Sequence, residues 1–186
     1  MSFLKKSTVR FCIVFLCALA MTIGGATIGA FADSGGATAT VHAGQLTEAG
    51  TFGESVSTTL DGTDQTLSYT LPVQLKDATG SGSGWNLQIS ATALSDGVNG
   101  HSALTQQVSA ASASCVSGNH CTGATSATPP SYPLVLSSTA QKFFSADANS
   151  GMGILNVSTS LQVLVPGNTY AGTYTTTLTL AVVSGP

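Results

Sequence analysis

Hydrophobic and polar residues alternate through several stretches of this chain, and a period of two is typical of strands. The clearest stretch covers residues 65–75 and predicts a strand with one apolar face. Pro72 falls at one of the alternate, polar positions of this stretch and has no backbone N–H to donate, so we expect a sheet edge or a bulge there. The apolar parity consists of Leu67, Tyr69, Leu71, Val73 and Leu75.

Two further alternations lie toward the C-terminus. The first covers residues 154–165, and the turn-forming sequence Pro166-Gly167-Asn168 separates it from the second, residues 169–183. Each predicts a strand. The residues that share a parity are Leu155, Val157, Thr159, Leu161, Val163 and Val165 in the first and Tyr170, Gly172, Tyr174, Thr176, Leu178, Leu180 and Val182 in the second.

The only tryptophan of the chain follows a Gly/Ser-rich loop, residues 77–83. Trp85, Leu87 and Ile89 fall on one face of the strand that this segment predicts. Because only 6% of the residues are aromatic, Trp85 is the expected anchor of either a core or a binding surface. The pattern leaves both roles open.

Turn signals separate the remaining segments. We expect a first strand at residues 37–44, an irregular crossing or edge strand at 45–54 that continues to 60, and another strand at 133–136. Residues 95–132 have the weakest pattern and predict an insertion, part strand and part loop. The fold class is therefore all-β: a single β-sandwich of seven to nine mostly antiparallel strands, without a helix.

Residues 1–32 have the pattern of a secretory signal peptide. Lys5, Lys6 and Arg10 precede an apolar stretch, and Ala30-Phe31-Ala32 offers a cleavage site. An uncleaved N-terminal anchor is the alternative, because the apolar stretch is about long enough to span a bilayer. We expect cleavage, which leaves one mature domain at residues 33–186 and no membrane segment after it.

Charge restricts the partners of the mature chain. Its only basic residues are Lys76 and Lys142, and it contains all eight acidic residues of the chain, so its formal net charge is 2 − 8 = −6. Nucleic acids and anionic lipids require clustered basic residues, and the mature chain has none. Glycan and protein partners remain open.

Cys115 and Cys121 are the only cysteines beyond residue 32. In an exported chain, we expect them to form a disulfide that closes a small loop and staples the insertion. A metal site made of both thiols and His120 is the alternative, but it lacks a fourth ligand. The three histidines stand in no catalytic motif. We therefore expect no metal, no cofactor and no enzymatic activity.

Two segments carry a family resemblance. Residues 77–87 resemble the first signature of the WxL domain, through Asp77, Thr79, Gly80, Gly82, Gly84, Trp85, Asn86 and Leu87. The last residues resemble its second signature, with Gly172, Tyr174 and the closing Pro186 in place. Leu180 stands where the family has a second tryptophan, and Val182 stands at the place of its leucine. The resemblance covers residues 38–186.

The resemblance implies a secreted protein that associates non-covalently with the cell wall of Gram-positive bacteria through peptidoglycan. It implies that Asp77, Gly84, Trp85 and Leu87 form a binding motif, and that Tyr174, Leu180 and Val182 form a degenerate second one. The residues also allow a structural or adhesive subunit that pairs with other surface proteins through a sheet edge. A third possibility is an exported ligand-binding module without a wall role. The oligomeric state stays open.

Overall fold

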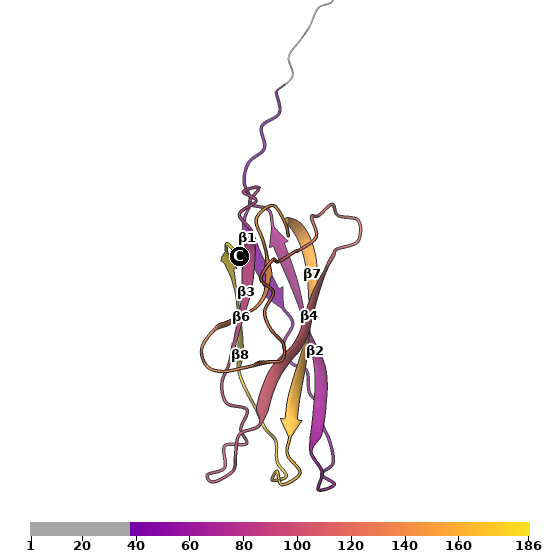
Figure 1. The fold of residues 1–186 in the computed structure, drawn as a ribbon, viewed down its shortest axis with the longest axis vertical. Coiled ribbons are helices and arrows are strands. Elements are labelled where there is room, and N and C mark those ends of the chain that lie inside the picture. Colours follow the sequence, from indigo (N-terminus) through magenta and orange to yellow (C-terminus); the bar gives the residue numbers. More distant parts are fainter. Residues whose placement is uncertain (1–37) are drawn as a thin grey trace, which may run out of the picture. The chain divides into compact units, whose positions relative to one another are not determined.

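Eight strands and no helix make up residues 38–186, the part of the chain that the computed structural model describes (Figure 1). The leader expected at residues 1–32 lies outside the described residues. Among the described residues, no helix is long and apolar enough to cross a membrane. The strands are β1 (Leu46–Gly50), β2 (Gln65–Asp77), β3 (Trp85–Ala91), β4 (Thr105–Cys115), β5 (Leu134–Val135), β6 (Gln141–Ala146), β7 (Gly153–Val165) and β8 (Leu178–Ser184).

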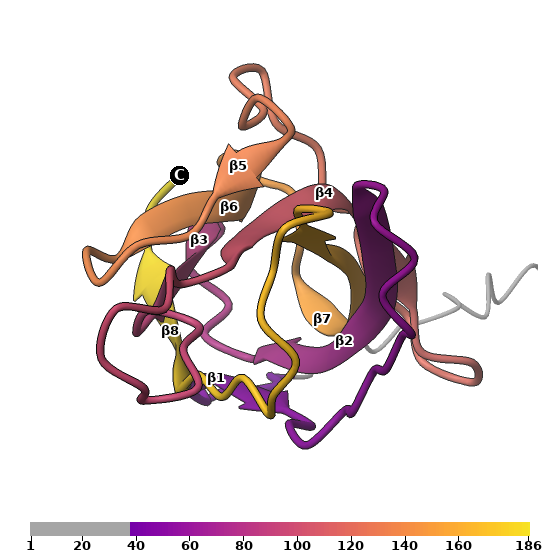
Figure 2. The ribbon, with the colours of Figure 1, turned by 90° about the horizontal axis from the view of Figure 1, so that it is seen from below.

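The strands form two antiparallel sheets. The larger sheet has the order β1-β2-β7-β4-β5 and the smaller one the order β6-β3-β8. Viewed along the strands, β2, β7 and β4 lie on one side of a common interior, and β3, β6 and β8 lie on the other (Figure 2). The prediction of an all-β sandwich is confirmed.

The pairing of β2 with β7 is the longest in the molecule. It runs from Gln65 opposite Val165 to Asp77 opposite Gly153 without a register shift. The register places the two apolar parities opposite each other, so both strands turn the same face inward. The inner residues of the two sheets form one core, which includes Leu71, Val73, Leu75, Trp85, Leu87, Ile89, Val108, Phe143, Leu155, Val157 and Leu161.

Pro72 marks the place where β1 ends. Its carbonyl accepts a hydrogen bond from the backbone N–H of Thr51, at 3.1 Å. The residues of such an antiparallel pair normally exchange two bonds, but proline has no N–H to return. Pairing with β1 therefore stops at Gly50, opposite Val73. The expected edge is a local one, because β2 continues to pair with β7 on its other side.

Two expected strands differ from the structure. Of the strand expected at 37–44, the described residues 38–44 form no strand: Val41 is the one large apolar side chain among them, and it is 92% exposed. The last strand begins only at Leu178, and of the residues before it Thr175 makes an isolated bridge to Ser95. Periodicity alone does not form a strand where no neighbouring strand and no core receive it.

The expected insertion contains a central strand of the larger sheet. β4 pairs with β7 from Thr105 opposite Leu164 to Cys115 opposite Leu155, with a bulge between Val108 and Ala110. Its inward side chains are mostly small or polar, which explains its weak hydrophobic pattern. The prediction of part strand and part loop is confirmed.

The expected disulfide joins Cys115 to Cys121 just after β4. The bonded thiols rule out the alternative metal site with His120. The loop lies against the beginning of β7: Val116 N–H donates to the Ile154 carbonyl and Thr122 N–H to that of Met152, both at 3.0 Å. The bridge therefore closes a loop that these two hydrogen bonds fasten to the start of β7.

Reduction of the disulfide is predicted to lower stability without unfolding the sheets. Closing a loop this short contributes about 2 kcal/mol through the entropy of the unfolded chain, and the strands themselves pair without the bridge. Thermal unfolding followed by circular dichroism should show a lower midpoint and an unchanged β spectrum for Cys115→Ser/Cys121→Ser. Loss of the β spectrum at 25 °C would contradict this prediction.

Candidate functional site

Trp85 is a core residue with no exposed surface. It opens β3, the central strand of the smaller sheet, between Ala146 of β6 and Ser184 of β8. Its indole Nε1 donates a hydrogen bond to the carbonyl of Gly151, at 2.9 Å. The ring lies 6.1 Å from that of Phe144, tilted by 38°. The indole therefore joins β3 to the loop that precedes β7.

Two glycines make room for this tryptophan. Gly151 has a φ of +69°, and a Cβ there would lie 2.6 Å from the indole nitrogen and 2.5 Å from Cβ of Ala146. Gly84 has a φ of +75°, and a Cβ there would lie 2.4 Å from the carbonyl oxygen of Ala146. A side chain at Gly151 would push the loop away from the ring, and one at Gly84 would collide with the backbone of Ala146 and Asp147. The Gly-Trp pair of the first motif is thus required by packing.

Asp77 and Leu87, the other residues of the first motif, are also buried. Asp77 is 5% exposed, and its Oδ1 accepts bonds from the N–H of Thr79 at 3.0 Å and from its hydroxyl at 2.7 Å. This arrangement stabilises the turn after β2. Since Trp85 and Leu87 have no exposed surface, any part they play in ligand binding is indirect, through the loops they hold.

A row of hydroxyl groups crosses the loop between Asp77 and Trp85. Thr79 Oγ1 lies 2.9 Å from Ser81 Oγ, which lies 3.0 Å from Ser83 Oγ, and Ser83 Oγ lies 3.2 Å from Ser184 Oγ of β8. The row ties the loop of the first motif to the C-terminal strand. It accounts for the alternation of glycine with hydroxyl residues in residues 79–84.

The two motifs meet only in part. Leu180 lies opposite Ile89 and Val182 opposite Leu87, so β8 places the second motif directly beside the first. Both side chains are half-buried and pack on the core. Tyr174 lies beyond the other end of β8, where its hydroxyl donates to the carbonyl of Tyr170 at 3.1 Å. It takes no part in the surroundings of Trp85.

A second polar cluster lies near Tyr174. His101 Nδ1 lies 2.6 Å from Asp96 Oδ2, and the imidazole stacks on the ring of Tyr170 with centroids 3.9 Å apart. The hydrogen bond from His101, followed by that from the N–H of Val98, lowers the pKa of Asp96. Burial, then the charge of Asp96, raises the pKa of Tyr174. These contacts join the loop after β3 to the loop before β8.

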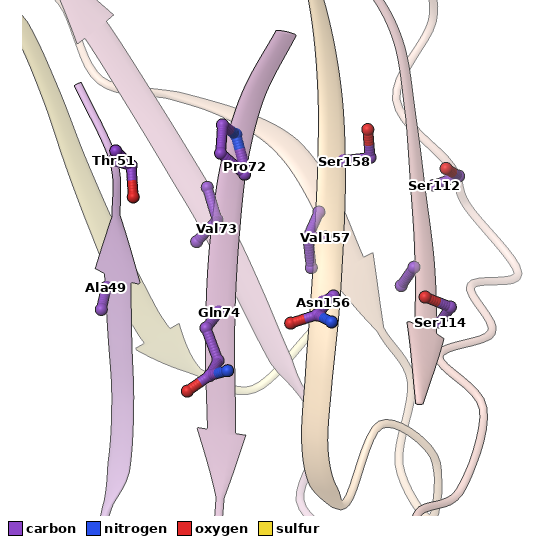
Figure 3. A pocket seen from close by; sticks show the side chains of 11 residues that line it. Ala49, Thr51, Pro72, Val73, Gln74, Ser112, Ser114, Asn156, Val157 and Ser158 are labelled. Atoms are coloured by element: carbon purple, nitrogen blue, oxygen red, sulfur yellow. The ribbon is translucent and has the colours of Figure 1, made fainter. Parts of the chain in front are cut away.

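The larger sheet carries a hollow on its outer face, away from Trp85. Its volume is about 400 Å³, and it spans β1, β2, β7 and β4 (Figure 3). Gln74 of β2 lies opposite Asn156 of β7, which lies opposite Ser114 of β4. In the next row, Ser158 lies between Pro72 and Ser112. The exposed side chains are amides, hydroxyls and a proline ring, and none is charged.

Sequence reasoning missed this hollow. The polar parities of residues 65–75 and 154–165 contain Gln74 and Asn156, which is a signal for an outward face. The pairing with β4 that brings Ser112 and Ser114 beside them depends on a register that no local pattern predicts. Amides and hydroxyls both donate and accept hydrogen bonds, so this face suits an uncharged polar ligand.

The comparisons identify one family. A family model described as a WxL domain, surface cell wall-binding, matches residues 36–186. No curated protein and no solved structure matches the sequence.

Gly151→Ala is predicted to destabilise the protein more than Gly97→Ala does. Both glycines have a positive φ, +69° and +76°, so both substitutions incur left-handed strain of about 1–2 kcal/mol. No atom lies within 4 Å of a Cβ at Gly97, whereas one at Gly151 meets the indole. We expect a further loss of about 1–3 kcal/mol at Gly151 from overpacking. Urea unfolding followed by circular dichroism measures both; equal losses would contradict the packing role.

Asp96→Asn is predicted to reduce the acid sensitivity of the fold. The pKa of Asp96 is lowered in the folded state, so the carboxylate stabilises the protein above its ordinary pKa of 3.8. That stability is lost as the pH falls through the folded value. Between about pH 5 and pH 2, the unfolding free energy of the variant should decline less than that of the wild type. Glu54→Gln, at an exposed position, is the charge-matched control; an equal change in both variants would contradict the role of Asp96.

Proposed function

Because this chain belongs to the WxL family of surface cell wall-binding domains, we propose that it is an exported, non-catalytic protein that attaches non-covalently to bacterial peptidoglycan. The observation that carries the proposal is the extent of the family match. Residues 36–186 include all eight strands, so the whole sandwich corresponds to the wall-binding domain. Association with the cell wall at the cell surface follows from the family; peptidoglycan as the component bound is the proposed part.

The charge of the chain supports peptidoglycan over the anionic polymers of the wall. Residues 33–186 have a formal net charge of −6 and only two lysines, Lys76 and Lys142. A polyphosphate polymer would be repelled by this surface, because it needs clustered cations to bind. Sugar hydroxyls and acetamido groups need hydrogen-bond donors and acceptors instead, which the threonine-, serine- and amide-rich surface supplies.

Export is supported by the leader pattern of residues 1–32 and by the disulfide. A bridge between Cys115 and Cys121 is typical of an oxidising compartment outside the cytoplasm. We propose that the mature protein consists of residues 33–186, released by cleavage after Ala32. The WxL-like motifs then act through the fold: Trp85 and its glycines set the loops, and exposed side chains elsewhere contact the wall.

Co-sedimentation with purified sacculi tests the proposal. The folded chain from residue 33 is predicted to pellet with sacculi from which teichoic polymers have been removed, and to stay in solution without them. It should also release no soluble sugar or peptide from them, as expected of a non-catalytic binder. The same chain after unfolding in urea and rapid dilution, checked by circular dichroism to be non-native, is the control.

Absence of the folded chain from the pellet would contradict peptidoglycan binding. Binding that appears only with untreated sacculi would instead assign the anionic polymers as the ligand. Release of soluble fragments would contradict the non-catalytic role.

A further inference from the structure

The hollow on the outer face of β1, β2, β7 and β4 has the properties of a ligand-binding site. We propose that it binds the uncharged glycan strand of the wall polymer, through the amides of Gln74 and Asn156 and the hydroxyls beside them. The inference rests on the proposed function, since it presupposes that the domain binds peptidoglycan. It adds the site and the part of the polymer that the site recognises.

The shape of the hollow suits an extended chain. At about 400 Å³, it lies within the size range of small-ligand sites. Its lining residues come from four neighbouring strands and the segment just after β1, so the hollow runs across the sheet. The outward side chains at the two sides of the hollow are small, with Ala49 on β1 and Ser112 and Ser114 on β4. Because Pro72 ends the pairing of β1, the sheet is also narrower on that side.

The chemistry of the hollow matches a sugar with acetamido groups. The cross-strand register sets Gln74 beside Asn156 and Asn156 beside Ser114, so donors and acceptors stand in a row across three strands. Figure 3 shows the two amides on adjacent strands, with the serine hydroxyls in the neighbouring positions. Each amide offers two donors and one acceptor oxygen, which is what glycan hydroxyl and acetamido groups require. The ring of Pro72 adds an apolar contact.

A second amide pair on the same sheet behaves differently. Gln107 Nε2 donates to Gln162 Oε1 at 3.0 Å, so these two side chains bind each other. Among residues 38–186, no such bond joins Gln74 to Asn156, although they are also directly opposite each other. The amides in the hollow are therefore available to a ligand, whereas Gln107 and Gln162 supply a matched comparison outside it.

Charge selects the glycan over the other parts of the wall. No ionisable side chain lines the hollow, and Lys76, in the next row of β2 opposite Ile154, is the basic residue nearest along that strand. A charged peptide stem or a phosphate would leave its charge unpaired here, at a cost in binding free energy. A neutral sugar strand carries no such penalty.

Paired alanine variants test the site. Gln74→Ala/Asn156→Ala is predicted to weaken binding to purified sacculi, and to neutral oligomers of N-acetylglucosamine, on the order of tenfold or more, because two sets of hydrogen bonds are lost. Gln107→Ala/Gln162→Ala removes two amides from the same sheet outside the hollow and should bind within about twofold of the wild type. Tyr170→Ala, at the exposed aromatic cluster, should do the same. Equal melting temperatures and β spectra establish that each variant is folded.

The outcomes separate the site from the function. If the wild type binds sacculi and the Gln74/Asn156 variant binds equally well, the hollow is not the site, while the proposed function stands. Loss of binding in Tyr170→Ala, or in the Gln107/Gln162 pair as large as that in the hollow, overturns the inference as well. Binding to free stem peptides but not to neutral N-acetylglucosamine oligomers overturns the inference, because the site then recognises another part of the polymer. A wild type that binds no sacculi overturns both proposals.

Discussion

The structure depends on the burial of one indole ring. Trp85 has no exposed surface, and its Nε1 donates to the carbonyl of Gly151, which lies in the loop just before β7. The smaller sheet is thereby joined to the beginning of β7, one of the two longest strands of the larger sheet. A buried indole N–H without a partner would cost about 1–3 kcal/mol, so the position of the loop and that of the ring are coupled. Gly151 lies too close to this ring to carry a side chain, and Gly84, next to the tryptophan, lies too close to the backbone of Ala146 and Asp147.

This coupling explains why the family motif is a folding motif in this chain. Asp77 stabilises the turn that leaves β2, the hydroxyl row crosses to Ser184, and β8 lies beside β3. All of these contacts gather where β2 and β4 end and β7 begins, toward the upper end in Figure 1, where the disulfide loop also lies against β7. With Leu180 in place of a second tryptophan, β8 still packs on the core. The motif residues therefore hold the two sheets and their loops together.

The two faces of the larger sheet differ: one is apolar and packs on the core, and the other is polar and exposed. Its inner face carries Leu71, Val73, Leu155 and Val157 into the core, and the alternate residues of the same strands form the polar outer face. A period of two separates these tasks along each strand, so a wall-contacting surface can vary without disturbing the packing beneath it. Such a surface needs no charge to remain soluble, because amides and hydroxyls bind water as readily as they bind sugar.

Much of the fold could be predicted from local patterns, and the site could not. The strands at residues 65–77 and 153–165 follow from alternation, and the disulfide follows from the only two cysteines beyond residue 32 together with the expectation of export. The expected strand at 37–44 was wrong because alternating alanine and threonine bury too little to hold a strand in place. The hydrophobic alternation of β4 is weak because most of its inward residues are small, so the sequence does not mark it as a strand. The sequence does not decide whether Trp85 belongs to the core or to a binding surface, because its partner Gly151 lies far along the chain and no short pattern relates them.

The sequence by itself therefore determined the all-β class, the inward and outward positions of the longest strands, and the scarcity of basic residues. These properties are local, or sums over residues. Only the tertiary structure decided that Trp85 is sealed inside, and that Gln74, Asn156 and Ser114 stand in one row. Those facts depend on the register between distant strands, which is set by how all the apolar faces pack at once.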